Sequence, residues 1–223
     1  MRTGIITGAS SGMGREFVLQ AAARGELDEI WVIARRAERL EQLQREVSVP
    51  LFVLPLDLTR AESFETSRRI LEQRRPQVTL LVNASGFGKF GRYDEIPLQD
   101  SLDMIDLNCK ALVHITQLTL PYLERGAHVI QVDSLSAFQP VPYLGVYGAT
   151  KAFVLSYSRS LRPSAPAGSK RSFLTMRSRP PRPPSPISTG CSPPGRWWPA
   201  PCGILPGAGM CASPAFRSRP RSC

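Results

Sequence analysis

The feature that most constrains this chain is an alternation of short apolar segments with stretches of helical periodicity over its first 161 residues. The apolar segments cover residues 3–7, 29–34, 51–56, 78–82 and 127–132, and helical patterns cover residues 15–24, 37–47, 61–74, 98–120 and 147–161. Strands that alternate with helices in this way pair in parallel, because each crossover must run over a face of the sheet. The sequence therefore predicts an α/β fold with a doubly wound parallel sheet and helices on both faces.

A glycine-rich turn, Gly8-Ala9-Ser10-Ser11-Gly12-Met13-Gly14, links the first expected strand to the first expected helix. In such a unit, glycines let the backbone approach a phosphate, and the helix amino terminus offers N–H groups and a favourable dipole. The spacing is Gly-x3-Gly-x-Gly rather than Gly-x-Gly-x-x-Gly, and any tight turn also uses glycine. Its position predicts a Rossmann-like dinucleotide site, with candidate contacts at Gly8, Ser10, Ser11, Gly12, Met13 and Gly14.

Two arginines, Arg35 and Arg36, end the second expected strand about 20 residues beyond the glycines. At this place in the fold, an acidic residue binds the ribose hydroxyl of NAD, whereas arginine accommodates the 2′-phosphate of NADP. The sequence therefore favours NADP(H) over NAD(H). The alternative is that both arginines belong to a solvated basic turn.

Tyr147 and Lys151 are four residues apart at the start of the last helical pattern, which places a phenol and an ammonium on one helix face. A fixed cation favours the phenolate, so Tyr147 can exchange a proton with an alcohol or carbonyl oxygen. Ser134 follows an apolar strand, where its hydroxyl can bond the same oxygen. Taken alone, such a Tyr-Lys pair also arises by chance.

A glycine-rich loop with three aromatic residues, running from Phe87 to Tyr93, follows the fourth expected strand. The carboxyl end of a strand is where an α/β sheet holds its ligand. Apolar residues near this loop and near Tyr147 indicate an apolar substrate pocket, although they would equally serve the core: Phe87, Phe90, Phe138, Val141 and Leu144.

The ordered set of motifs resembles the classical short-chain dehydrogenase/reductase family over residues 1 to about 161. The match comprises Thr7-Gly8-x3-Gly12-x-Gly14, Asp57, Asn83-x-x-Gly86, Asn108, Ser134 and Tyr147-x3-Lys151. The family usually has Asn-Asn-Ala-Gly after its fourth strand, whereas Ala84 and Ser85 occupy the second and third of these places here. We expect this departure to change local hydrogen bonds without removing the cofactor site.

The resemblance implies a role for each matched residue. Tyr147 would be the catalytic acid/base, Lys151 would favour its ionised form and bind the nicotinamide ribose, and Ser134 would position the substrate oxygen. Asn108 would hold a water in a proton relay. In the cofactor site, Asp57 would contact adenine with Leu58 beside it, and Asn83 would support the sheet. The implied reaction is the NADP(H)-dependent interconversion of a secondary alcohol and a ketone.

The resemblance ends near residue 161, where the composition changes. Residues 1–161 carry 18 basic and 18 acidic residues, whereas residues 162–223 carry the other 10 basic residues, no acidic ones and 14 of the 21 prolines. Proline at this density opposes helices and central strands. We therefore expect an incomplete domain over residues 1–161, with its last strands missing or replaced by an irregular tail over residues 162–223.

A frameshift near residue 162 would explain this Pro-, Arg- and Ser-rich tail, and the coding DNA read in its other frames would test that hypothesis. Two alternatives to an active enzyme follow from the tail. The chain is either an inactive dinucleotide-binding remnant or, with less support, a nucleic-acid-binding protein acting through the basic tail.

The remaining expectations concern partners and location. The sequence has no Cys-x-x-Cys pair and only two histidines, His114 and His128, so we expect no metal. It lacks a signal-peptide pattern and an apolar run long enough to span a membrane, which predicts a cytoplasmic protein. The resemblance also implies a homodimer or homotetramer through the helices at residues 98–120 and 147–161.

Overall fold

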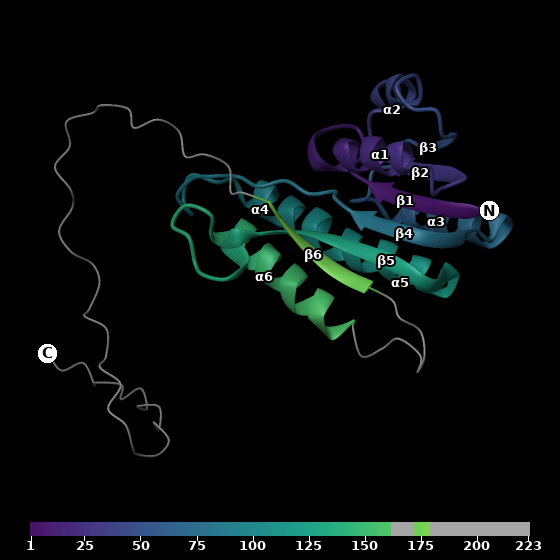
Figure 1. Ribbon diagram of the computed structural model, residues 1–223. Helices are drawn as coiled ribbons and strands as arrows, with labels where there is room; N and C mark the ends of the chain where they lie inside the picture. The colour runs from purple at the N-terminus through teal and green to yellow at the C-terminus, as the bar shows by residue number, and fades with distance from the viewer. Residues whose placement is uncertain (162–171, 179–223) are drawn as a thin grey trace, which may run out of the picture. The chain divides into compact units, whose positions relative to one another are not determined.

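The computed structural model describes residues 1–161 and 172–178, and expectations for the remaining residues lie outside this range. A parallel sheet of six strands forms the centre of the described part (Figure 1). The strands are β1 (Arg2–Thr7), β2 (Glu29–Ile33), β3 (Leu51–Leu54), β4 (Gln77–Asn83), β5 (Leu123–Ser134) and β6 (Ser172–Ser178). Their order is β3-β2-β1-β4-β5-β6, and every neighbouring pair is parallel. The predicted α/β fold is confirmed.

Helices cover both faces of the sheet (Figure 1). The helices α1 (Gly12–Arg24) and α2 (Ala37–Gln44) pack on one face, whereas α3 (Ala61–Arg74), α5 (Leu112–Thr119) and α6 (Gly145–Ser160) pack on the other. Each face has its own apolar core. Val18 of α1 and Leu40 of α2 belong to the first core, and Phe64 of α3 and Ile115 of α5 belong to the second.

The sequence of β2 is an uninterrupted apolar run from Ile30 to Ile33, because both faces of this strand are buried. Ile30 and Val32 lie in the core beneath α1 and α2, while Trp31 and Ile33 lie in the core beneath α3 and α5. Successive side chains of a strand point to opposite faces, and a parallel sheet is buried on both of them. An apolar run without alternation is therefore what this position requires.

The strand β6 lies where the sequence offers Ser172–Met176 as a remnant strand without supporting context, inside a segment expected to be irregular from residue 162. Residues Ser172–Ser178 pair in parallel with β5, from His128 opposite Ser172 to Ser134 opposite Ser178. Without this strand, the N–H and C=O groups along one edge of β5 would lack ladder partners. The domain boundary expected at residue 161 stays a prediction, because most residues beyond it lie outside the described range.

The helical stretch expected over residues 98–120 is divided into several elements. The helix α4 (Leu98–Ile105) leads into a π-helical segment, η1 (Asp106–Ala111), which is followed by α5 and a 3₁₀ turn, η2 (Leu120–Tyr122). Wide π-turns are rare and occur frequently at functional sites. Asn108 lies within η1, so the irregular turn coincides with a predicted site residue.

Candidate active site

The order of the strands identifies one crevice of the sheet. From β1, the chain builds outward through β2 and β3 on one side and through β4, β5 and β6 on the other. In doubly wound sheets, ligands bind outside the carboxyl ends of the strands where this order reverses, here between β1 and β4. Thr7 ends β1, and its Oγ1 accepts hydrogen bonds at 3.1 Å from the backbone N–H groups of Ala84 and Ser85. The two residues that depart from the family pattern are thus tied to the crevice by backbone groups.

The glycine-rich turn lies at this crevice, and its geometry requires glycine. Gly8 and Gly12 have φ angles of 70° and 57°, in the left-handed region that favours glycine. A Cβ on Gly8 would lie 2.8 Å from the carbonyl oxygen of Ala84, and a Cβ on Gly14 would overlap the carbonyl group of Gly8. The turn therefore brings β1, α1 and the chain after β4 into direct backbone contact.

The amino terminus of α1 adjoins this turn. Its N-cap residue, Ser11, has extended backbone and makes no side-chain capping hydrogen bond. Met13 is partly exposed in the first turn of the helix. The first N–H groups of a helix have no partner within the helix, and together with its dipole they favour an anion.

Arg36 reaches back to the glycine-rich turn from the end of β2. Its Nη2 lies 3.1 Å from Oγ of Ser10 and 3.1 Å from Oγ of Ser11, and donates to both. The sequence pattern places Arg36 near the cofactor site, but these contacts with the turn are visible only in the structure. They put a guanidinium beside the helix terminus.

Asp57 lies after β3, near Arg35. Its Oδ1 accepts hydrogen bonds from the backbone N–H of Thr59 at 3.0 Å and from Thr59 Oγ1 at 2.7 Å. Partial burial disfavours the charged form, but the Thr59 hydrogen bonds and the charges of Arg35 and Arg60 outweigh it, so the pKa of Asp57 lies below its ordinary value. The neighbouring side chain of Leu58 is buried in the core.

Asn108 connects the π-turn to the loop after β4 and to α6. Its Oδ1 accepts from the backbone N–H of Phe87 at 3.0 Å, while its Nδ2 donates to the carbonyl oxygen of Phe87 at 2.9 Å and to Thr150 Oγ1 at 3.0 Å. Thr150 Oγ1 in turn donates to the carbonyl oxygen of Tyr147 at 2.7 Å. Sequence reasoning finds Asn108 but misses Thr150.

Two glycines of the loop after β4 pack on the other predicted catalytic residues. A Cβ on Gly86 would lie 2.8 Å from Asn108 Oδ1 and 3.8 Å from Lys151 Nζ. A Cβ on Gly88 would lie 2.7 Å from Cδ2 of Tyr147. One short loop therefore contacts Asn108, Tyr147 and Lys151, which three different sequence motifs supply.

Lys151 is almost completely buried. Its Nζ donates to the carbonyl oxygen of Val132 at 2.9 Å and lies 5.7 Å from the ring centroid of Tyr147. Burial lowers the pKa of the Lys151 ammonium, and the negative charge of Asp133 acts in the opposite direction. The predicted Tyr-Lys pair is thus held against the end of β5.

Ser134 is fully buried at the end of β5. Its Oγ accepts from the backbone N–H of Ser136 at 3.3 Å and from Ser136 Oγ at 3.0 Å. The 3₁₀ turn that contains Ser136, η3 (Leu135–Ala137), packs on the start of α6, where a Cβ on Gly148 would lie 3.5 Å from the carbonyl oxygen of Ser136. Ser136 is a second residue that the sequence motifs do not reveal.

Asn83 ends β4 and is bonded to the helix α5. Its side chain is buried, and Nδ2 donates to Thr116 Oγ1 of α5 at 3.0 Å. Gln131, its register partner on β5, donates to the same oxygen at 3.1 Å. This cluster joins β4, β5 and α5, and the supporting role implied for Asn83 stays a prediction.

Four of the five residues expected in an apolar pocket pack around Tyr147. Met104, Leu144 and Tyr147 form a buried cluster, and Phe87, Phe90, Val141 and Val146 pack against it. Phe138, the fifth, is 46% exposed and does not belong to this cluster. The surroundings of the Tyr147 phenol are therefore apolar.

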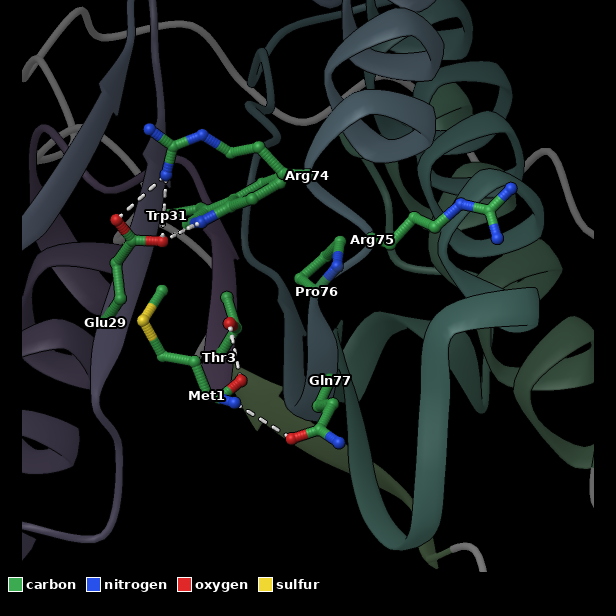
Figure 2. A pocket seen from close by; sticks show the side chains of 8 residues that line it. All are labelled: Met1, Thr3, Glu29, Trp31, Arg74, Arg75, Pro76 and Gln77. Atoms are coloured by element: carbon green, nitrogen blue, oxygen red, sulfur yellow. Dashed lines mark hydrogen bonds and ion pairs between the residues drawn. The ribbon is translucent and has the colours of Figure 1, made fainter.

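A cavity of about 330 Å³ lies at the opposite end of the sheet (Figure 2). Its lining includes Thr3, Glu29 and Gln77, which are at the amino ends of β1, β2 and β4. The Glu29 carboxylate accepts hydrogen bonds from Trp31 Nε1 at 2.5 Å and from Arg74 Nη1 at 3.1 Å (Figure 2). Since this cavity is at the amino ends of the strands, it is separate from the crevice that holds the site residues.

The fold and the crevice define a dinucleotide-binding α/β protein of the doubly wound type. The chain belongs to the short chain dehydrogenase family, whose model matches residues 2–167. The sequence-based recognition of this oxidoreductase family is therefore confirmed.

Known proteins similar to this chain include dehydrogenases and a solved NADPH complex. Serine 3-dehydrogenase from Rhizobium radiobacter is 36% identical over 165 residues, which cover 71% of this chain and 64% of that protein. NADP-dependent 3-hydroxy acid dehydrogenase from Escherichia coli is 32% identical over 161 residues, with the same coverage of 71% and 64%. The structure of a short-chain dehydrogenase from Sphingobium yanoikuyae in complex with NADPH has a TM-score of 0.71 at 27% identity, covering 80% of this chain and 71% of that one.

Metal-binding clusters and membrane-spanning helices are both absent from the described residues. Residues 1–161 and 172–178 contain no group of three or more His, Cys, Asp or Glu side chains placed to hold a metal ion. Within the same ranges, no helix is both long enough and apolar enough to cross a membrane. The expected cytoplasmic location stays a prediction.

Proposed function

We propose that this chain is an NADP(H)-dependent oxidoreductase that interconverts a secondary alcohol and a ketone. One observation carries the proposal: residues 84–88 contact the glycine-rich turn at one end and Asn108, Tyr147 and Lys151 at the other. Residues 84–88 thus connect the proposed dinucleotide-binding turn to the phenol that would transfer the proton, and all of these groups lie at the crevice.

The turn has the form of a dinucleotide site: Gly8 and Gly14 let β1, α1 and the chain after β4 approach at backbone distance, and a Cβ on Gly12 would meet no protein atom within 4 Å. The pyrophosphate would be held by Gly8, Ser10, Ser11, Gly12, Met13 and Gly14, with the N–H groups at the start of α1 as donors. Arg35 and Arg36 would hold the 2′-phosphate of NADP(H), which supports the preference over NAD(H). Asp57 and the backbone of Leu58 would contact the adenine ring of the cofactor.

When bound, the nicotinamide supplies or accepts a hydride at C4. In the reductive direction, Tyr147 gives its phenolic proton to the ketone oxygen as the carbonyl carbon gains the hydride, and in the oxidative direction it takes that proton back. The hydroxyl of Ser134 donates a hydrogen bond to the same oxygen. Lys151 places positive charge near the phenol and binds the nicotinamide ribose, and Asn108 holds a water in the proton relay.

The cluster around Tyr147 supports an apolar substrate. Phe87, Phe90, Val141 and Leu144 surround the phenol with carbon atoms, and a polar substrate would lose hydration there without gaining hydrogen-bond partners. We therefore infer a ketone or secondary alcohol with an apolar substituent, such as an aryl alkyl ketone.

Binding titrations test the cofactor site directly. The fluorescence of NADPH and of NADH is followed as protein is added, with the unchanged chain, a Gly14→Ala variant and a Gly145→Ala variant. A Cβ at position 145 meets no atom within 4 Å, so Gly145→Ala is the matched control. We expect NADPH to bind more tightly than NADH, Gly14→Ala to abolish binding and Gly145→Ala to preserve it. A folded chain that binds neither nucleotide would contradict the proposal.

A second candidate is a cofactor-binding protein without turnover. It is favoured by the composition beyond residue 161. Nucleotide binding without oxidation of NADPH by any carbonyl compound would distinguish this candidate from the enzyme.

We also propose a homodimer or homotetramer formed through α4 and α6. Large apolar side chains are exposed on these helices: Leu98, Leu102 and Ile105 on α4, and Phe153 on α6. Light scattering over a range of concentrations tests this assembly, which a monomer at all concentrations would rule out.

A further inference from the structure

Two charged side chains, Asp133 and Lys151, are buried next to each other at the end of β5. Asp133 is 0% exposed and Lys151 is 6% exposed. Burying a charge is unfavourable unless an opposite charge or hydrogen bonds compensate it. The catalytic proposal above accounts for Lys151 but gives Asp133 no role.

Backbone geometry places the two residues close together. Lys151 Nζ lies 2.9 Å from the carbonyl oxygen of Val132, the residue that precedes Asp133. Because the peptide unit is planar, that oxygen lies about 3 Å from the Cα of the next residue. The ammonium is therefore within about 6 Å of the Asp133 Cα.

The direction of the Asp133 side chain follows from the pleat of β5. Gln131 contacts Thr116 of α5, and residues two apart on a strand share one face. Asp133 thus lies on the face of the sheet that α5 and α6 cover. Lys151 approaches β5 from α6 on this same face, and Asp133 raises its pKa against the effect of burial.

Other titratable groups also face Lys151 or Asp133. Cys109 of η1 interacts electrostatically with Lys151, but burial raises the pKa of its thiol, which keeps it neutral near pH 7. Tyr147 lies on the same helix as Lys151, with its ring centroid 5.7 Å from Lys151 Nζ. Of the two groups whose charges act on the Lys151 ammonium, Asp133 and Cys109, Asp133 is therefore the one that can compensate the ammonium.

We propose that Asp133 is a positioning residue, whose buried carboxylate keeps Lys151 charged and holds its ammonium at the crevice beside Tyr147. The catalytic consequence of this pairing rests on the proposed function. Without the carboxylate, Lys151 would lose its proton at a lower pH, and the site would lose the positive charge that favours proton transfer by Tyr147.

The four lysines of the chain, Lys89, Lys110, Lys151 and Lys170, allow a direct test. With lysine labelled at Cε, NMR gives one signal per lysine, and the signal absent from the Lys151→Arg variant belongs to Lys151. In Asp133→Asn, we expect the Lys151 titration midpoint to move to lower pH. In the control Asp106→Asn, which removes the exposed partner of Lys110 at 3.6 Å, the Lys151 midpoint should not move.

An unchanged Lys151 midpoint in folded Asp133→Asn would overturn the proposal, because the carboxylate would then have no effect on the charge of Lys151. Asp133→Ser provides a second variant with a smaller side chain. If neither Asp133 variant folds, the proposal is tested by measuring the free energy of unfolding of Lys151→Met in urea over a range of pH, against the unchanged chain. Lys151→Met removes the ammonium that compensates the buried Asp133 carboxylate, so its stability deficit should grow as the pH rises and the carboxylate forms, and a constant deficit would overturn the proposal.

The NMR result also separates this inference from the proposed function. A shifted Lys151 midpoint in a chain without turnover would support the Asp133–Lys151 pairing while contradicting the enzymatic activity. In an active chain, the alkaline limb of the pH profile of kcat should move to lower pH in Asp133→Asn, because Lys151 then loses its proton earlier.

Discussion

Ser136 Oγ lies 3.0 Å from Ser134 Oγ and donates a hydrogen bond to it. Because Ser136 acts as the donor, the proton of the Ser134 hydroxyl is available for a substrate oxygen. Ser136→Ala should therefore lower kcat about fivefold, the effect of one neutral hydrogen bond, with a smaller change in KM. Ser136→Thr, which keeps the hydroxyl, should restore most of the rate. Steady-state kinetics tests both variants, and an unchanged kcat in Ser136→Ala would exclude this role.

Gly88 should be intolerant of any side chain. A Cβ would lie 2.7 to 3.0 Å from three atoms of the Tyr147 ring, so Gly88→Ala must displace either the ring or the loop. We expect kcat to fall at least tenfold, since small displacements of a catalytic group have large effects on rate. Gly145→Ala is the control, because its added methyl group meets open space. Equal rates for the two variants would show that the contact has no functional importance.

Arg36 should determine the preference for NADP(H). A charge-assisted hydrogen bond contributes about 1.5 to 3 kcal/mol, so Arg36→Ala should raise the Kd of NADPH by about 10- to 100-fold and leave that of NADH almost unchanged. Arg39→Ala removes the same charge from an exposed position on α2 and should change neither constant. If Arg36→Ala weakened both nucleotides equally, Arg36 would stabilise the turn rather than recognise the 2′-phosphate.

Thr116 should be important for stability rather than for catalysis. Its Oγ1 accepts hydrogen bonds from Asn83 and Gln131, so Thr116→Val leaves two buried amide groups without an acceptor. We expect a loss of about 2 to 4 kcal/mol in the free energy of unfolding, measured in urea. Thr116→Ser, which retains the hydroxyl, should lose much less. A Thr116→Val protein as stable as the unchanged chain would show that the cluster contributes little.

The sequence predicts the elements of this fold well because their signals are local. The glycine-rich turn, the apolar run of β2 and the Tyr147-x3-Lys151 pattern can each be recognised within a few residues. The sequence indicates β6 only as a candidate remnant strand over Ser172–Met176, because its flanks are basic and proline-rich and its pairing with β5 is a long-range contact. A helical period does not reveal the π-turn at Asn108.

For the site, the motifs give the residues but not the contacts between them. The glycine-rich turn before a helix indicates a phosphate site, whereas the contacts of Arg36 with Ser10 and Ser11 depend on how β2 lies beside β1. Ser136, Thr150 and Asp133 belong to no motif used for the prediction. Their positions follow from the packing of α6 and η1 against the end of β5.

The central claim is that Tyr147 transfers a proton while a hydride passes between NADP(H) and a carbonyl carbon. The most direct measurement is the oxidation of NADPH, followed by its absorbance, with aryl alkyl ketones as substrates and with the unchanged chain and Tyr147→Phe side by side. We predict oxidation that depends on the ketone in the unchanged chain, and a loss of at least 100-fold in Tyr147→Phe with NADPH binding retained. A chain that binds NADPH but oxidises it no faster than Tyr147→Phe does would contradict this claim and identify a cofactor-binding protein without turnover.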